Sequence, residues 1–178
     1  NYKQIILKTN LETEETNKWA EVSSQMYFPF SKEYDVYLQQ DGFLDKELVP
    51  ASKLPKSERP INQKWSWDRI LRSPYIKQAD VLQGFYFFEN LFDDQTIEKH
   101  FDFYEPLTVH ESSLSPVVHS ILSSKIDRNE KAYEMYLLTS RLDLDYYNHE
   151  VQEGLHITSM AGTWLSIVQG FGGMRNFS

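Results

Sequence analysis

The chain has 178 residues, of which 40% are apolar and 25% charged, a composition that indicates a folded domain and excludes a disordered chain. Its net charge of −8 argues against a nucleic-acid binder, and the absence of cysteine excludes disulfides, a thiolate nucleophile and a zinc–thiolate site. No run approaches the roughly 18 apolar residues of a membrane span and no signal-peptide pattern is present, so we expect a cytoplasmic protein that binds no membrane.

The first third of the chain predicts few regular elements. Residues 1–11 are compatible with a short strand or with the end of an element that lies outside this chain. From Glu12 the spacing of apolar residues predicts a helix, which Pro29 ends. Residues 41–64 contain Gly42, three prolines and many charges, which favours an exposed linker over a functional rim.

The remainder predicts helices joined by short loops, and therefore an all-α fold. One helix is expected at 76–89 and another at about 129–142. Between them, Asp93 and Ser115 are the expected N-caps of two further helices. The clearest helix follows, with an apolar stripe at helical spacing made by Ile157, Met160, Ala161, Trp164, Leu165, Val168 and Phe171.

Three polar loops precede predicted helices, at residues 73–78, 110–115 and 153–159. A helix N-terminus presents unpaired N–H groups and partial positive charge, so polar side chains beside it can complete an anion site. On spacing alone each such residue has an ordinary alternative, as a loop serine, a structural histidine or a solvated helix surface. The candidate binding residues in these loops are Lys77, Gln78, Ser112, Ser113 and His156.

Two other patterns do not predict a metal site. Residues 143–148 begin like a calcium loop but lack the third ligand and the glycine. His149 and His156 have no further ligand at a zinc spacing. We therefore expect no metal and no cofactor.

Four strings in this sequence carry a resemblance to a known family. They are RPINQKWSWDRILRSPYIKQADVLQG, FDFYEPLTVHESSLSPVVHSIL, KAYEMYL and EGLHITSMAGTWLSIVQGFGGMR, within residues 58–175. They resemble the maltose phosphorylases of glycoside hydrolase family sixty-five.

The resemblance implies that residues 1–178 are the C-terminal portion of an (α/α)6 catalytic barrel within a larger, homodimeric polypeptide. It also implies inverting phosphorolysis of maltose, giving β-glucose 1-phosphate and glucose. On this reading Lys77 and Gln78 bind sugar, whereas Ser112, Ser113 and His156 hold phosphate, which is a substrate rather than a cofactor.

These residue types suit a phosphorylase. An inverting hydrolase needs one carboxylic acid and one carboxylate that activates water. Phosphate is itself an anionic nucleophile, so neutral hydroxyl and imidazole donors can replace that carboxylate.

The resemblance also leaves parts of the reaction outside the chain. The family's general acid is a glutamate expected upstream, and we do not assign its role to Glu111, Glu150 or Glu153. We therefore expect the isolated chain to be inactive and its apolar helix faces to be exposed. The alternatives are phosphorolysis of trehalose, kojibiose or nigerose, a hydrolase of the same fold with Glu111 or Glu153 as base, and an inert helical fragment.

Overall fold

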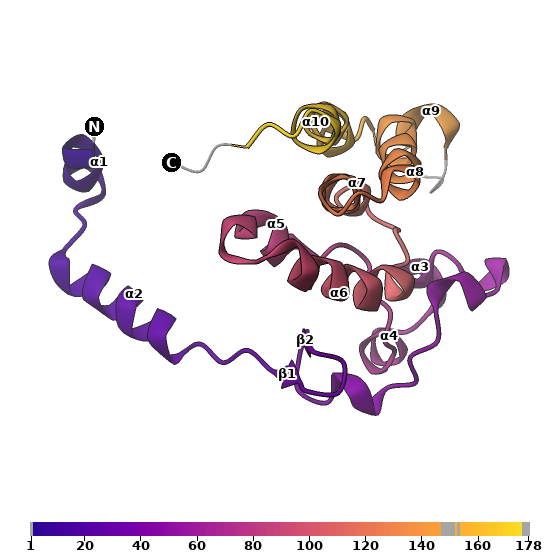
Figure 1. Ribbon diagram of the computed structural model, residues 1–178, viewed down its shortest axis with the longest axis horizontal. Helices are drawn as coiled ribbons and strands as arrows, with labels where there is room; N and C mark the ends of the chain where they lie inside the picture. Colours follow the sequence, from indigo (N-terminus) through magenta and orange to yellow (C-terminus); the bar gives the residue numbers. More distant parts are fainter. Residues whose placement is uncertain (1, 147–151, 153, 176–178) are drawn as a thin grey trace.

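The computed structural model describes residues 2–146, 152 and 154–175, and it confirms the expected all-α class (Figure 1). The α-helices are α1 Tyr2–Thr9, α2 Thr13–Gln25, α3 Ile61–Lys64, α4 Trp67–Arg72, α5 Val81–Phe87, α6 Asp94–Tyr104, α7 Ser115–Lys125, α8 Asn129–Ser140, α9 Leu142–Asp145 and α10 Ile157–Leu165. A π-helical stretch, Ser166–Phe171, continues α10, and the two strands β1 Phe30–Ser31 and β2 Val36–Tyr37 pair antiparallel. None of the described helices is long and apolar enough to cross a membrane.

Helices α1 and α2 form an arm that extends away from the rest of the chain (Figure 1). Neither helix has a buried residue, and Trp19, Val22 and Met26 of α2 are all more than half exposed. The helix expected after Glu12 is confirmed, whereas the strand considered for residues 1–11 is wrong, because Tyr2–Thr9 is helical.

Residues 41–64 are packed against the domain, so their interpretation as an exposed linker is wrong. They form three 3-10 turns, Phe43–Asp45, Ala51–Lys53 and Lys56–Glu58, and lead into α3. Phe43 is fully buried in the main hydrophobic core, and Ile61 is 2% exposed in a second small cluster. Many charges in a segment therefore did not prevent its few apolar residues from anchoring it.

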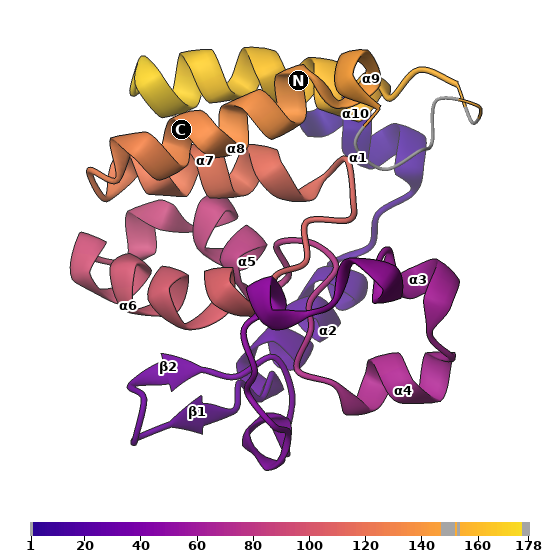
Figure 2. The same ribbon diagram turned by 90° about the vertical axis from the view of Figure 1, so that its right-hand side faces the viewer.

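Helix α7 lies at the centre of the layered body, with α5 and α6 on one side and α8 and α10 on the other (Figures 1 and 2). It is buried from Ser115 to Ser123, which explains why its sequence has no single apolar face. Of its buried polar groups, Ser120 Oγ donates to the Ala132 carbonyl at 2.9 Å, whereas Ser123 Oγ and His119 Nε2 have no hydrogen-bond partner among the described residues. The main core is built from Phe43, Ile76, Ala79, Leu82, Phe85, Ile97, Phe101, Tyr104, Leu107, Val117, Val118, Ile121 and Leu122.

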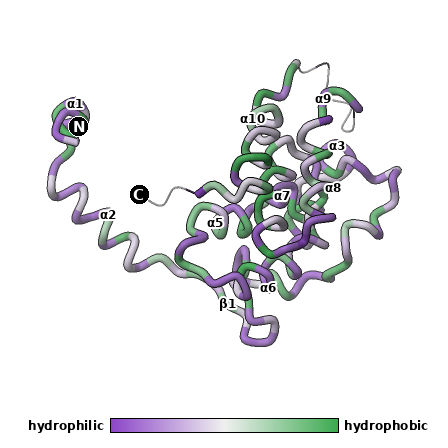
Figure 3. Tube along the Cα trace, turned by 45° about the horizontal axis from the view of Figure 1, so that its top comes forward, coloured by the Kyte–Doolittle hydropathy of each residue, from purple (hydrophilic) through white to green (hydrophobic). Residues whose placement is uncertain are grey.

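Helix α10 contacts α7 through its small residues. Ser159, Gly162, Ser166 and Gly170 are the buried positions of α10 and its π-helical continuation. The apolar stripe identified in the sequence is present but largely exposed, and Trp164 is 61% accessible. Green, hydrophobic stretches accordingly follow α10 as well as the central α7 in Figure 3.

The sequence predicts helix N-caps at Asp93 and Ser115, and the structure confirms the first but not the second. The side chain of Asp93 accepts a hydrogen bond from the Thr96 main-chain N–H at 2.7 Å, which confirms the N-cap. Ser115 is not a cap, because α7 begins at Ser115 itself and its Oγ is hydrogen-bonded to His110 Nδ1 at 2.9 Å.

Candidate functional site

Loops 73–78 and 107–113 are held together by their backbones. Ile76 receives a hydrogen bond from Val109 N at 2.9 Å and donates to Leu107 O at 3.0 Å, in a parallel bridge. Beyond this bridge, Ser112 Oγ donates to Gln78 Oε1 at 3.1 Å. The structure therefore brings together one residue expected to bind sugar and one expected to bind phosphate.

The third loop joins this site through the first turn of α10. Ser159 Oγ donates to the Ser113 carbonyl at 3.4 Å, and a Cβ at Gly162 would meet Val117 Cβ at 3.0 Å. These contacts pair the start of α10 with the start of α7, so both N-termini lie at the same end of the helical layers (Figure 2). The structure thus links the loop before α7 to each of the other two.

His156 is the residue immediately before α10, and the carboxylate of Asp143 contacts both its main chain and its ring. Asp143 on the short helix α9 accepts from His156 main-chain N at 2.9 Å and contacts its Nδ1 at 2.5 Å. Hydrogen bonds from the His156 side chain and main chain hold the pKa of Asp143 below its usual range, so Asp143 is ionised at neutral pH. Sequence reasoning missed this pair, because residues 13 apart share no helical or strand period.

Lys77 and Gln78 lie outside the helix in which they were expected. Helix α5 begins only at Val81, and Asp80 has a positive φ of 39° that interrupts any earlier helical turn. Lys77 is exposed and Gln78 half-buried. The prediction of both in a first helical turn is therefore wrong, although Gln78 still reaches Ser112.

A buried charge network supports the loop behind Ser112. The neighbouring His110 imidazole and the Lys131 ammonium lower the pKa of Glu105 to about 2, and burial lowers the pKa of His119 to about 3. His110 has a positive φ of 54° and contacts both Ser115 and His119. His119 is fully buried, whereas Glu105 and His110 line a cavity of about 650 Å³ whose lining includes neither Ser112 nor Gln78, and their mutual contacts indicate a role in holding the loop.

Glu111 lies beside Ser112 in sequence, but its carboxylate is fully engaged. It is 5% exposed, pairs with Arg59 Nε at 3.0 Å and accepts from Ile61 N at 2.7 Å. Such a carboxylate fastens α3 to the loop and is unsuited to activating water. Glu150 and Glu153, which were also considered, lie outside the described residues, as does His149.

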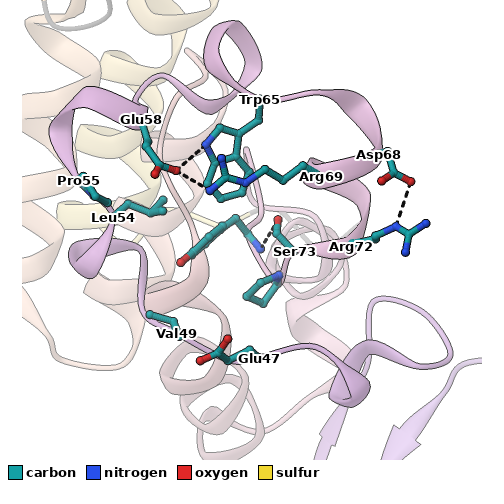
Figure 4. Close-up of a pocket in the computed structure, with 12 residues that line it drawn as sticks. Glu47, Val49, Leu54, Pro55, Glu58, Trp65, Asp68, Arg69, Arg72 and Ser73 are labelled. Carbon is teal, nitrogen blue, oxygen red and sulfur yellow. Dashed lines mark hydrogen bonds and ion pairs between the residues drawn. The ribbon is translucent and has the colours of Figure 1, made fainter.

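A cavity of about 500 Å³ opens elsewhere, between the 3-10 turns and α4 (Figure 4). Its polar groups are already paired: Glu58 accepts from Trp65 Nε1 at 2.8 Å and from Arg69 at 2.6 Å, and Arg69 covers the indole ring. None of the five predicted binding residues lines it. We therefore assign this cavity no part in the site.

The converging loops offer an anion a set of donors. Hydroxyls come from Ser112 and Ser113, an imidazole from His156, and an ammonium and an amide from Lys77 and Gln78. Among the described residues, the Asp143 carboxylate contacts this set through His156. Within the described residues, no group of three or more His, Asp or Glu side chains could hold a metal ion.

The chain is similar to known proteins over most of its length. Residues 1–165 match the glycosyl hydrolase family 65 central catalytic domain. A maltose phosphorylase of Bacillus subtilis (strain 168) is 56% identical over 161 residues, covering 90% of this chain and 21% of that protein. An α,α-trehalose phosphorylase of Thermoanaerobacter brockii is 41% identical, covering 99% of this chain and 23% of that protein.

A solved structure is similar to this chain in both fold and sequence. It is named a putative kojibiose phosphorylase from human microbiome, and it matches 98% of this chain with a TM-score of 0.83 and 38% identity. The match covers 23% of that chain. This chain therefore spans less than a quarter of the length of the relatives that it matches.

Proposed function

The chain belongs to glycosyl hydrolase family 65, its helices are part of the family's (α/α)6 barrel, and from this premise we propose that the complete protein phosphorolyses an α-glucosidic disaccharide with inversion. The products are β-glucose 1-phosphate and the released sugar. We assign residues 1–178 to the C-terminal portion of the catalytic barrel.

The observation that carries this proposal is the set of donors at two paired helix N-termini. Ser112 and Ser113 precede α7, and His156 precedes α10. Main-chain N–H groups and the positive end of each helix favour an anion there. We propose that these three residues hold phosphate, while Lys77 and Gln78 bind the sugar.

In the reaction, a phosphate oxygen forms a bond to the anomeric carbon as the glucosidic C–O bond breaks. The leaving oxygen takes a proton from a carboxylic acid, which we expect from a part of the protein outside this chain. No carboxylate is needed as a base, because phosphate already carries the negative charge of a nucleophile. The engaged carboxylate of Glu111 agrees with this and disfavours a hydrolase that uses it as base.

Maltose is the first substrate that we propose. The maltose phosphorylase is 56% identical, against 41% for the trehalose phosphorylase and 36% for a kojibiose phosphorylase of Halothermothrix orenii. Trehalose and kojibiose are the runners-up. We further propose that the complete protein is a homodimer and that it is located in the cytoplasm.

Incubation of the complete protein with maltose, trehalose and kojibiose, each with and without phosphate, tests the proposal. We expect the disaccharide to be consumed only when phosphate is present, most rapidly for maltose, and proton NMR to show the β-anomer of glucose 1-phosphate. Release of two free glucose molecules without phosphate would instead identify a hydrolase.

A further inference from the structure

His156 has two polar contacts with Asp143, one through its main-chain N–H and one through its ring, and both are made with the same carboxylate. Asp143 Oδ2 accepts from the main-chain N–H of His156 at 2.9 Å, and Oδ1 lies 2.5 Å from its Nδ1. The side chains of Asp143 and His156 are only 15% and 17% exposed. A bidentate contact of this kind fixes both the position of the residue and the rotation of its ring.

The surrounding elements hold Asp143 in place. Helix α9 follows α8 directly, and the end of α8 lies against the start of α10, where Thr139 Oγ1 approaches the Ser159 carbonyl at 3.5 Å. Arg141 and Asp145, the other charged residues of this turn, pair with each other at 2.6 Å. Helix α10 itself carries no charged residue.

The other elements at this end direct their charges elsewhere. On the loop before α7, Glu111 pairs with Arg59 and His110 contacts Ser115 and Glu105. Lys77, the cation of the neighbouring loop, is exposed. Asp143, by contrast, is in direct contact with the imidazole.

We propose that Asp143 is a positioning residue for phosphate, which holds His156 Nδ1 so that the imidazole meets the anion through Nε2. This inference rests on the proposed function. A carboxylate that accepts from Nδ1–H fixes the tautomer and the rotation of the ring, which leaves Nε2 as the nitrogen directed away from Asp143. An imidazolium donates from Nε2 to phosphate, whereas the neutral ring with its proton on Nδ1 presents a lone pair that repels it.

Replacement of Asp143 by asparagine in the complete protein tests the proposal, since the amide keeps the shape and one acceptor but removes the charge. We expect the KM for phosphate at pH 7 to rise about tenfold, because a charge-assisted hydrogen bond is lost, with the KM for maltose changed less than about twofold. A merely structural defect would not separate the two KM values in this way.

Two further variants make the result decisive. Asp145→Asn removes a carboxylate from the same helix and should leave both KM values as they are. Asp143→Glu retains the charge and should keep the phosphate KM closer to that of the original protein than Asp143→Asn does. This second variant tests the charge even where Asp143→Asn fails to fold.

The outcomes separate this inference from the function on which it rests. If His156→Ala raises the phosphate KM but Asp143→Asn matches the original protein in phosphate KM, the role of Asp143 is overturned and the phosphate site stands. If His156→Ala also leaves the phosphate KM unchanged, the assignment of His156 to phosphate fails.

Discussion

Single residues decide whether this site attracts phosphate or activates water. Ser112, Ser113 and His156 place donors beside two helix N-termini, whereas the nearest glutamate in sequence, Glu111, is turned to Arg59 and Ile61. A second carboxylate facing the anion would repel it. The engagement of Glu111 with Arg59 and Ile61 therefore favours the proposed phosphorolysis over a hydrolysis that uses Glu111 as base.

Replacing Glu111 by glutamine should affect stability and not chemistry. The variant loses the ion pair with Arg59 but keeps an acceptor for Ile61 N, so we expect a loss of about 1–3 kcal/mol and a lower thermal midpoint. The kcat should stay within about threefold, because a residue that acts as a general base would contribute about 10²–10⁴-fold. Thermal unfolding and steady-state kinetics of the complete protein measure both.

An exposed glutamate provides the control. Glu130→Gln, on the first turn of α8, should change neither stability nor kcat. A loss of more than about 100-fold in kcat for Glu111→Gln, with unchanged stability, would return Glu111 to the catalytic machinery.

At the scale of the elements, close packing of α7, α8 and α10 places the two helix starts side by side. A Cβ at Gly162 would approach Thr139 Oγ1 at 2.9 Å and Val117 Cβ at 3.0 Å. The absence of a side chain at this position allows the three helices to approach. Gly162 therefore helps to bring the two helix starts together, although it is not one of the candidate binding residues.

Gly162→Ala should destabilise the protein by about 1–3 kcal/mol, because the added methyl forces apart well-packed helices. The matched control is Gly84→Ala on α5, where a Cβ would meet no atom within 4 Å. Alanine there should stabilise the helix by about 0.5–1 kcal/mol. Thermal midpoints of the two variants should move in opposite directions, and equal midpoints would show that α10 does not pack on α7 through Gly162.

The positions of most helices could be predicted from sequence, since apolar spacing and the Asp93 cap are local signals. The start of α5 could not, because the bridge between Ile76 and Thr108 is a contact between distant parts of the chain that holds the preceding segment extended. Five candidate binding residues were predicted through the family resemblance, and their roles stay predictions. Asp143 was not, since its partner lies beyond any local period.

At the scale of the whole molecule, the faces of α1, α2 and α10 carry large exposed apolar residues. Ile5, Trp19, Trp164 and Met160 are each at least 46% accessible. The expectation of exposed apolar faces in this chain is thus confirmed. Contiguous exposure of this kind is typical of surfaces that are covered by other parts of a protein.

The central claim is that the loops before α7 and α10 form the phosphate site, and the phosphate KM of the complete protein tests it most directly. The two variants to measure are His156→Ala and the double replacement of Ser112 and Ser113 by alanine, with Ser24→Ala on α2 as control. Each lost charge-assisted hydrogen bond costs about 1.5–3 kcal/mol, so the phosphate KM should rise about tenfold or more while the maltose KM changes far less. An unchanged phosphate KM in both variants, or an equal rise in the maltose KM, would contradict the claim.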